Sequence, residues 1–149
     1  MMNEQLGETG PNAEMAQYNL LPILADAYGR VGEFDRAFTA LEQWLTIRRK
    51  YPIAAADKIY WRLRGELLLR AGSLDEAEKS LRSAIELSAG QGAKMEQLRS
   101  TAALARLLAK LGRRNEARVM LAEIYNWFTE GFETADLKDA KALLDELAG

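Results

Sequence analysis

Three stretches of the chain align with one another without gaps: LADAYGRVGEFDRA at 24–37, RGELLLRAGSLDEA at 64–77 and LARLLAKLGRRNEA at 104–117. A glycine recurs at 32, 72 and 112, and an alanine recurs at 37, 77 and 117. Both series therefore step by 40 residues. A fixed period of this length is the sequence signature of a helical repeat, in which each unit buries its apolar face against the next.

Each stretch has the pattern of two helices joined by a tight turn. The recurrent glycine supplies the left-handed residue that ends a first helix. A small residue before it, at 25, 65 or 105, lets the two helices approach closely, and the recurrent alanine has the same role on the second helix. The pattern predicts helices at 13–31, 34–50, 55–71, 74–89, 93–111, 114–129 and 135–148.

Composition restricts the classes of function. The 149 residues are 48% hydrophobic with a formal net charge of −2, and they include neither cysteine nor histidine. Disulfide frameworks, thiolate zinc sites and the commonest general base are therefore excluded, and we expect no enzyme and no cofactor or metal. With no apolar run of about 18 residues and no signal sequence, we expect no membrane contact and a cytoplasmic location.

The three units resemble the tetratricopeptide repeat (TPR), which has a small residue, an aromatic residue three later and an alanine twelve after the small one. The first unit keeps the aromatic residue, and the others replace it with leucine. This resemblance implies an all-α, right-handed superhelix of three TPR-like hairpins with a C-terminal capping helix. We expect a flexible lead-in at 1–12 and a single domain at 13–149, with units at about 18–54, 55–94 and 95–133 and a cap at 135–148.

A narrower resemblance covers residues 55 to 148. GELLL at 65–69, GRRNEAR at 112–118 and above all WFTEGFETADLK at 127–138 resemble the C-terminal repeats of bacterial class III adenylate-cyclase-like proteins, which also carry a P-loop ATPase domain. The resemblance implies the docking or sensing end of such a signalling protein, or a free-standing relative. It carries over no catalytic residue, because neither catalytic domain is present.

In TPR stacks the first helices of successive units line a concave peptide-binding groove. By register, the candidate groove residues here are Asn19, Asp26, Arg30, Arg62, Glu66, Arg70, Arg99, Arg106 and Lys110. Six of them are cations and two are carboxylates, and arginine forks suit carboxylates. We therefore expect a non-catalytic module that binds a protein or acidic peptide. The alternative is that these side chains form only the solvated face of amphipathic helices.

The aromatic residues suggest a core and a second surface. Trp44, Trp61 and Trp127 fall on predicted packing faces, so we expect them in the core. Phe128 and Phe132 precede the cap and, if exposed together, would form a self-association patch. Homodimerisation through this patch or the end helices is the structural alternative. Binding of nucleic acid is disfavoured, because no aromatic residues alternate with the cations.

Overall fold

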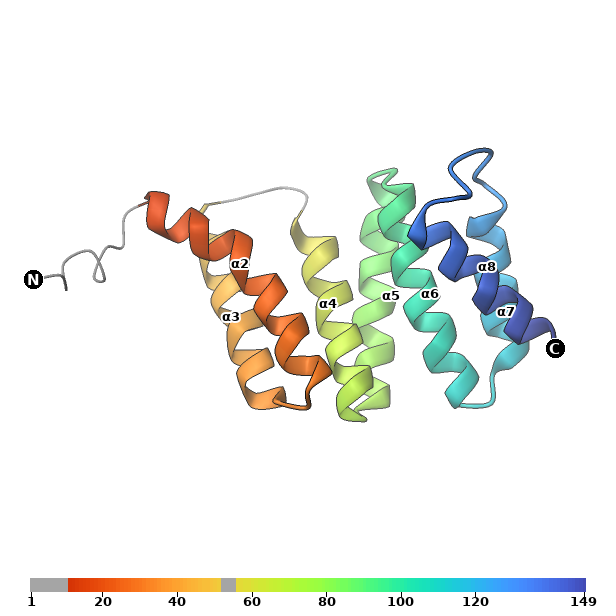
Figure 1. Ribbon diagram of the computed structural model, residues 1–149, viewed down its shortest axis with the longest axis horizontal. Coiled ribbons are helices and arrows are strands. Elements are labelled where there is room, and N and C mark those ends of the chain that lie inside the picture. The colour runs from red at the N-terminus through yellow and green to blue at the C-terminus, as the bar shows by residue number, and fades with distance from the viewer. Residues whose placement is uncertain (1–10, 52–55) are drawn as a thin grey trace, which may run out of the picture. The chain divides into compact units, whose positions relative to one another are not determined.

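The computed structural model describes residues 11–51 and 56–149, and these residues form seven α-helices and no strand (Figure 1). The helices are α2 (Pro11–Arg30), α3 (Phe34–Lys50), α4 (Ala56–Ala71), α5 (Leu74–Gly90), α6 (Lys94–Lys110), α7 (Arg114–Tyr125) and α8 (Ala135–Ala148). The predicted all-α class, with three hairpins and a terminal helix, is confirmed. Most of the predicted lead-in lies outside the described residues, and α2 begins at Pro11, where proline suits a first helical position.

The chain divides into two compact units, Met1–Ala56 and Asp57–Gly149. The first contains the hairpin α2–α3, and the second contains α4 to α8. The single domain expected over 13–149 stays a prediction.

Each hairpin turn has the same backbone geometry. Gly32, Gly72 and Gly112 adopt φ of 83°, 88° and 81°, the left-handed region that glycine enters at little cost. The residue after each glycine donates its N–H back to a carbonyl five residues earlier, at 2.9, 2.9 and 2.8 Å. This is the bond of the Schellman motif, and it satisfies a carbonyl at the helix end. The glycines that recur every 40 residues in the sequence therefore mark the turns between the two helices of each hairpin.

The second helix of each hairpin begins in the same way. Ala37, Ala77 and Ala117 are completely buried, and each donates its N–H to the carbonyl four residues earlier. In the second unit, the α-carbon of Gly65 lies so close to α5 that an added Cβ would stand 2.6 Å from Leu81 Cγ. Small residues at fixed positions thus allow the helices to nest, as the sequence predicts.

Helix α6 forms the centre of the second unit. It packs against α5, α7 and α8, and its residues Leu98, Leu104, Leu107 and Leu108 are at most 1% exposed. Helix α8 covers the last hairpin with Leu137, Ala140, Leu143 and Leu147. The predicted cap is therefore present over the range expected.

The first unit is held by aromatic and polar contacts between α2 and α3. The ring centroids of Tyr18 and Trp44 lie 5.2 Å apart, and Trp44 is buried. Glu14 accepts hydrogen bonds from Lys50 Nζ at 2.8 Å and from the Tyr51 hydroxyl at 2.6 Å. These bonds lower the pKa of Glu14 below its ordinary value.

Two predictions at the C-terminal end are wrong. The predicted helix 114–129 ends at Tyr125, and Trp127, expected in the core, is 56% exposed. The chain leaves the helix through a turn and later adopts a positive φ at Gly131, so Trp127 falls outside any packing face. Trp44 is in the core as predicted, while Trp61 is only half-buried.

Candidate functional site

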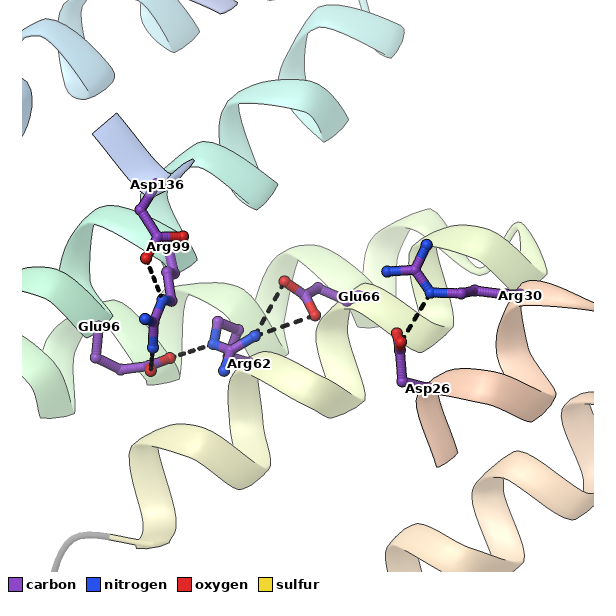
Figure 2. A network of polar contacts seen from close by, with 7 residues as sticks. All are labelled: Asp26, Arg30, Arg62, Glu66, Glu96, Arg99 and Asp136. Carbon is purple, nitrogen blue, oxygen red and sulfur yellow. Dashed lines mark hydrogen bonds and ion pairs between the residues drawn. The ribbon is translucent and has the colours of Figure 1, made fainter. Parts of the chain in front are cut away.

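Three of the predicted groove residues in the second unit lie in a polar network that joins α4, α6 and α8 (Figure 2). Arg62 and Glu66 are one turn apart on α4, and Arg62 Nη1 lies 3.3 Å from Glu66 Oε1. Arg62 Nε also donates to the Glu96 carboxylate on α6. Arg62 is thus held between two carboxylates, one from its own helix and one from its neighbour.

Arg99 continues the network from α6 to α8. Its Nε donates to Asp136 Oδ2 at 2.9 Å, and its Nη1 lies 3.6 Å from Glu96 Oε1. Figure 2 shows the resulting alternation of charge, Glu66–Arg62–Glu96–Arg99–Asp136. The predicted count of six cations and two carboxylates in the groove leaves out Glu96 and Asp136. Neither residue occupies a repeat position assigned to the groove.

The central residues of this network are buried, so the network stabilises the fold and does not present free charge to solvent. Glu96 is 7% exposed and the Arg62 side chain 15%. Burial by itself lowers the pKa of Arg62, but the negative charges of Glu66 and Glu96, with their hydrogen bonds, outweigh it and raise the pKa above its ordinary value. A buried charge is tolerated when it is paired and hydrogen-bonded. Arg62 and Arg99 are therefore already neutralised by the protein's own carboxylates.

Helix α6 reaches solvent through a narrow cationic strip, which we define as Arg99, Arg106 and Lys110. Among the residues from Glu96 to Leu108, all of which the structure describes, only Arg99 and Arg106 are exposed. Gln97 is half-buried and the others are buried. The small residue Ala102 stands between the two arginines, and Lys110 follows Arg106 one turn later. Arg106 and Lys110 make no hydrogen bond or ion pair with any residue that the structure describes. Their charge is available to a partner.

The remaining predicted groove residues divide between the two units. On α4, Arg70 is exposed two turns beyond Arg62. In the first unit Arg30 Nε donates to Asp26 Oδ2 at 2.7 Å, and Asn19 is exposed on the same helix. Within each unit the predicted residues thus lie along first helices of hairpins, as their register indicates. Whether they bind a peptide stays a prediction.

A second polar cluster, formed by Glu78, Arg82, Arg113 and Glu116, joins α5 to α7. Glu78 and Glu116 each accept hydrogen bonds from both arginines. Burial is the largest single influence on the pKa of Glu78 and raises it, but the hydrogen bonds and positive charges of Arg82 and Arg113 together outweigh burial and lower the pKa. The hydrogen bond from Arg113 is the main cause of the lowered pKa of Glu116. Sequence analysis missed this cluster, because Glu78, Arg82 and Arg113 have no like residue 40 positions away.

An aromatic loop, residues 125–132, precedes the cap. Tyr125 and Phe132 have ring centroids 5.8 Å apart, and Trp127 and Phe128 pack edge to face at 5.2 Å. Lys94 Nζ lies 5.3 Å from the centroid of Trp127. Phe132 is 42% exposed and Phe128 is half-buried, so only part of the predicted self-association patch is open to solvent.

Comparison with protein families finds a tetratricopeptide repeat at residues 59–91. The matched segment spans most of α4, the whole of α5 and the turn that follows, and it contains Arg62, Glu66 and Arg70. The fold is thus TPR-like, and repeats of this kind generally mediate protein–protein interaction and are typically not enzymes. A comparison with curated proteins found no match.

Two further properties of the described residues bear on the site. No helix among them is long and apolar enough to cross a membrane. They also contain no group of three or more carboxylates, histidines or cysteines that could hold a metal ion.

Proposed function

We propose that this chain is a protein-binding module that holds an acidic peptide segment against the cationic strip of α6. The observation that carries the proposal is the composition of the strip. The one edge by which α6 meets solvent has cations at each of its exposed positions, in a chain with a net charge of −2. Such a concentration of one charge on a slightly acidic protein favours a partner of opposite charge.

The chemistry of the strip supports a carboxylate ligand. Arg106 and Lys110 are exposed and make no internal ion pair with described residues, so a ligand would not have to displace a carboxylate of the protein. Arg99 is already shared between Glu96 and Asp136, so we assign it a weaker part. Arg70 lies eight residues beyond Arg62 on α4. It is towards the same end of the unit as Arg106, since α4 and α6 run in the same direction (Figure 1). Ala102 leaves room for a ligand backbone between the arginines.

The experiment uses a fluorescein-labelled, glutamate-rich peptide and a control peptide in which glutamine replaces each glutamate. We expect fluorescence anisotropy to report binding of the first peptide, weakened by added salt. The double variant Arg106→Glu/Lys110→Glu should lower affinity at least tenfold, because it replaces two attractive charges with two repulsive ones. The matched control is Arg118→Glu/Lys138→Glu, which reverses two exposed cations on α7 and α8 and should change affinity little.

The proposal fails if both peptides bind equally, if neither binds, or if the control variant loses as much affinity as the α6 variant. Circular dichroism of each variant would exclude unfolding as the cause of a loss.

We also propose that the module is regulatory and cytoplasmic. This part rests on the likeness of residues 55–148 to the C-terminal repeats of cyclase-like signalling proteins. The genes that neighbour this one, or any longer chain that contains the module, would test it. The absence of any signalling enzyme there would contradict it.

A further inference from the structure

Helix α2 carries an exposed apolar stripe on the side away from α3. We define the α2 stripe as Ala16, Leu20, Ile23 and Ala27, which follow one another at intervals of four, three and four residues. All four are exposed, Leu20 to 51% and Ile23 to 64%. Alternating steps of three and four keep side chains on one face of a helix and are typical of helices that pair with another helix.

The stripe lacks the charge that normally keeps an outer helix in water. No charged residue occurs from Ala16 to Ala25. Of the three charged residues of α2, Glu14 bonds Lys50 and Tyr51 at the end of α3. Arg30, which follows Ala27 at the next step of three, pairs with Asp26. A helix with an exposed apolar face and ten consecutive uncharged residues is expected to be covered.

The repeat register shows what this face does elsewhere in the chain. Adding 80 to the stripe positions gives Glu96, Ser100, Ala103 and Leu107 on α6, which are 7%, 0%, 3% and 0% exposed. Helix α6 has a preceding hairpin to pack against: it contacts α5, and its Glu96 bonds Arg62 of α4. Helix α2 begins the series and has no preceding hairpin among the described residues. Its stripe thus occupies the register positions that form a stacking face on α6, and on α2 these positions are exposed.

The surface beside the stripe is hollowed. A cavity of about 460 Å³ opens between α2 and α3, and Leu20, Leu24 and Ile47 line it. Leu20 therefore lies both on the stripe and at the rim of the cavity. A large apolar side chain from a partner helix would find room there.

The order of side chains in the stripe points to the partner. Read in either direction, the stripe runs small, large, large, small. In an antiparallel pair of identical helices with its two-fold axis between Leu21 and Pro22, Leu20 faces Ile23 of the other copy, and Ala16 faces Ala27. Isologous contacts require this self-complementarity, in which residue i meets j and j meets i. No charges of like sign are brought together, because the stripe has none.

We propose that the α2 stripe is a homodimer interface, in which two copies of this chain pair through antiparallel α2 helices. The stripe spans only three turns, which is small beside a typical stable interface of about 1,600 Å². We therefore expect a weak, reversible dimer with a dissociation constant in roughly the micromolar range. This inference is independent of peptide binding by α6, because it concerns another helix and another unit.

Sedimentation equilibrium over a wide range of concentration tests the dimer. The wild-type chain of 16.7 kDa should move from the monomer mass towards twice that mass as concentration rises. Ile23→Glu and Leu20→Glu should each weaken dimerisation at least tenfold, since each places two buried carboxylates in the interface. Both residues are exposed in the single chain, so the variants should keep the wild-type circular dichroism spectrum.

Two variants serve as controls. Val119→Glu adds the same charge at an exposed apolar position of α7, where Val119 is 53% exposed, and should leave the dimer intact. Phe132→Ser removes an exposed ring from the aromatic loop and should also leave it intact. A wild-type chain that stays monomeric at every concentration overturns the inference. So does a dimer that Phe132→Ser disrupts but Ile23→Glu does not.

Cross-linking tests the antiparallel register, because the chain has no cysteine of its own. A mixture of Leu20→Cys and Ile23→Cys chains should form a mixed disulfide faster than Ala16→Cys chains form a disulfide with themselves. The reason is that Leu20 and Ile23 face each other, whereas Ala16 faces Ala27. If Ala16→Cys chains cross-link to themselves most readily, the helices pair in parallel and the proposed register is wrong.

Discussion

Gly65 lies at a close approach of α4 to α5. A Cβ at this position would stand 2.6 and 2.7 Å from Leu81 Cγ and Cδ2 and 3.3 Å from the Leu81 backbone nitrogen. Leu81 is completely buried, so it has little room to move away. Alanine is the better helix former by about 1 kcal/mol, yet forced overpacking costs typically 1–3 kcal/mol. We predict that Gly65→Ala lowers the free energy of unfolding in urea by about 1 kcal/mol or more.

Gly90 is the matched control for this substitution. It is also helical, and nothing lies within 4 Å of an added Cβ. Gly90→Ala should therefore be neutral or slightly stabilising. If both substitutions stabilise the protein, the close approach at Gly65 is not a constraint on packing.

For single residues, the sequence predicts which small side chains lie between packed helices, but it predicts less well which large side chains are exposed to solvent. Close packing of paired helices requires small residues at fixed positions. A single sequence reveals these positions because they repeat, with a small residue at 25, 65 and 105 and an alanine at 37, 77 and 117. Trp127 stands at the register position of Ile47 and Leu87, so the repeat places it on a helix face. Its exposure depends on α7 ending at Tyr125, and helix ends are less strongly encoded than helix faces.

The link between α4 and α6 depends on Glu96. This carboxylate is almost fully buried and neutralises Arg62, whose side chain is itself only 15% exposed. Removing one partner of a buried pair leaves an uncompensated charge and costs 3–5 kcal/mol, although Glu66 still faces Arg62 here. We predict that Glu96→Ala lowers the free energy of unfolding by about 2–3 kcal/mol.

A double-mutant cycle with Arg62→Ala would check the cause, because the second substitution should recover part of the loss. Glu86→Ala, at an exposed position of α5, should change stability by less than about 0.5 kcal/mol. Equal effects at Glu96 and Glu86 would contradict the role assigned to the network.

The link between α5 and α7 should weaken in acid. Hydrogen bonds from Arg82 and Arg113 lower the pKa of Glu78 and Glu116 below their ordinary value of 4.5. A carboxyl group whose pKa is lower in the folded state adds stability above its unfolded pKa. That stability is lost as the pH falls through the folded value. We predict that the urea midpoint falls as the pH is lowered from about 5 to about 3.

The variant Glu78→Gln/Glu116→Gln should be less stable than the wild type at neutral pH and should depend less on pH over this window. A wild-type midpoint that stays constant, or rises, in acid would show that the cluster does not stabilise the fold.

The same networks explain why the candidate site was only partly predictable. Register alone places Arg62 and Arg99 on first helices of hairpins, and the structure agrees. Register does not reveal that Glu96 and Asp136 neutralise them, since α8 lies outside the repeat and Glu96 lies outside the groove positions. Among the predicted groove cations, Arg106 and Lys110 pair with no residue that the structure describes, and this emerges only from the contacts.

Among the described residues of the whole chain, three surfaces are open to partners: the cationic strip of α6, the stripe of α2 and the aromatic loop. They differ in chemistry, so each favours a different class of contact. The strip suits an acidic segment, the uncharged stripe suits an identical helix, and the rings of the loop already pack on one another and on Lys94. A module with separate surfaces can bind a partner and associate with itself independently.

The most direct test of the binding proposal is an NMR titration of the isotope-labelled chain with the glutamate-rich peptide. The shifts of backbone amides should change in α6 around Arg99–Lys110 and little in α2 or the aromatic loop. The glutamine-substituted peptide should cause no such change. Changes centred on α2 or residues 125–132, or equal changes with both peptides, would contradict the assignment of binding to the α6 strip.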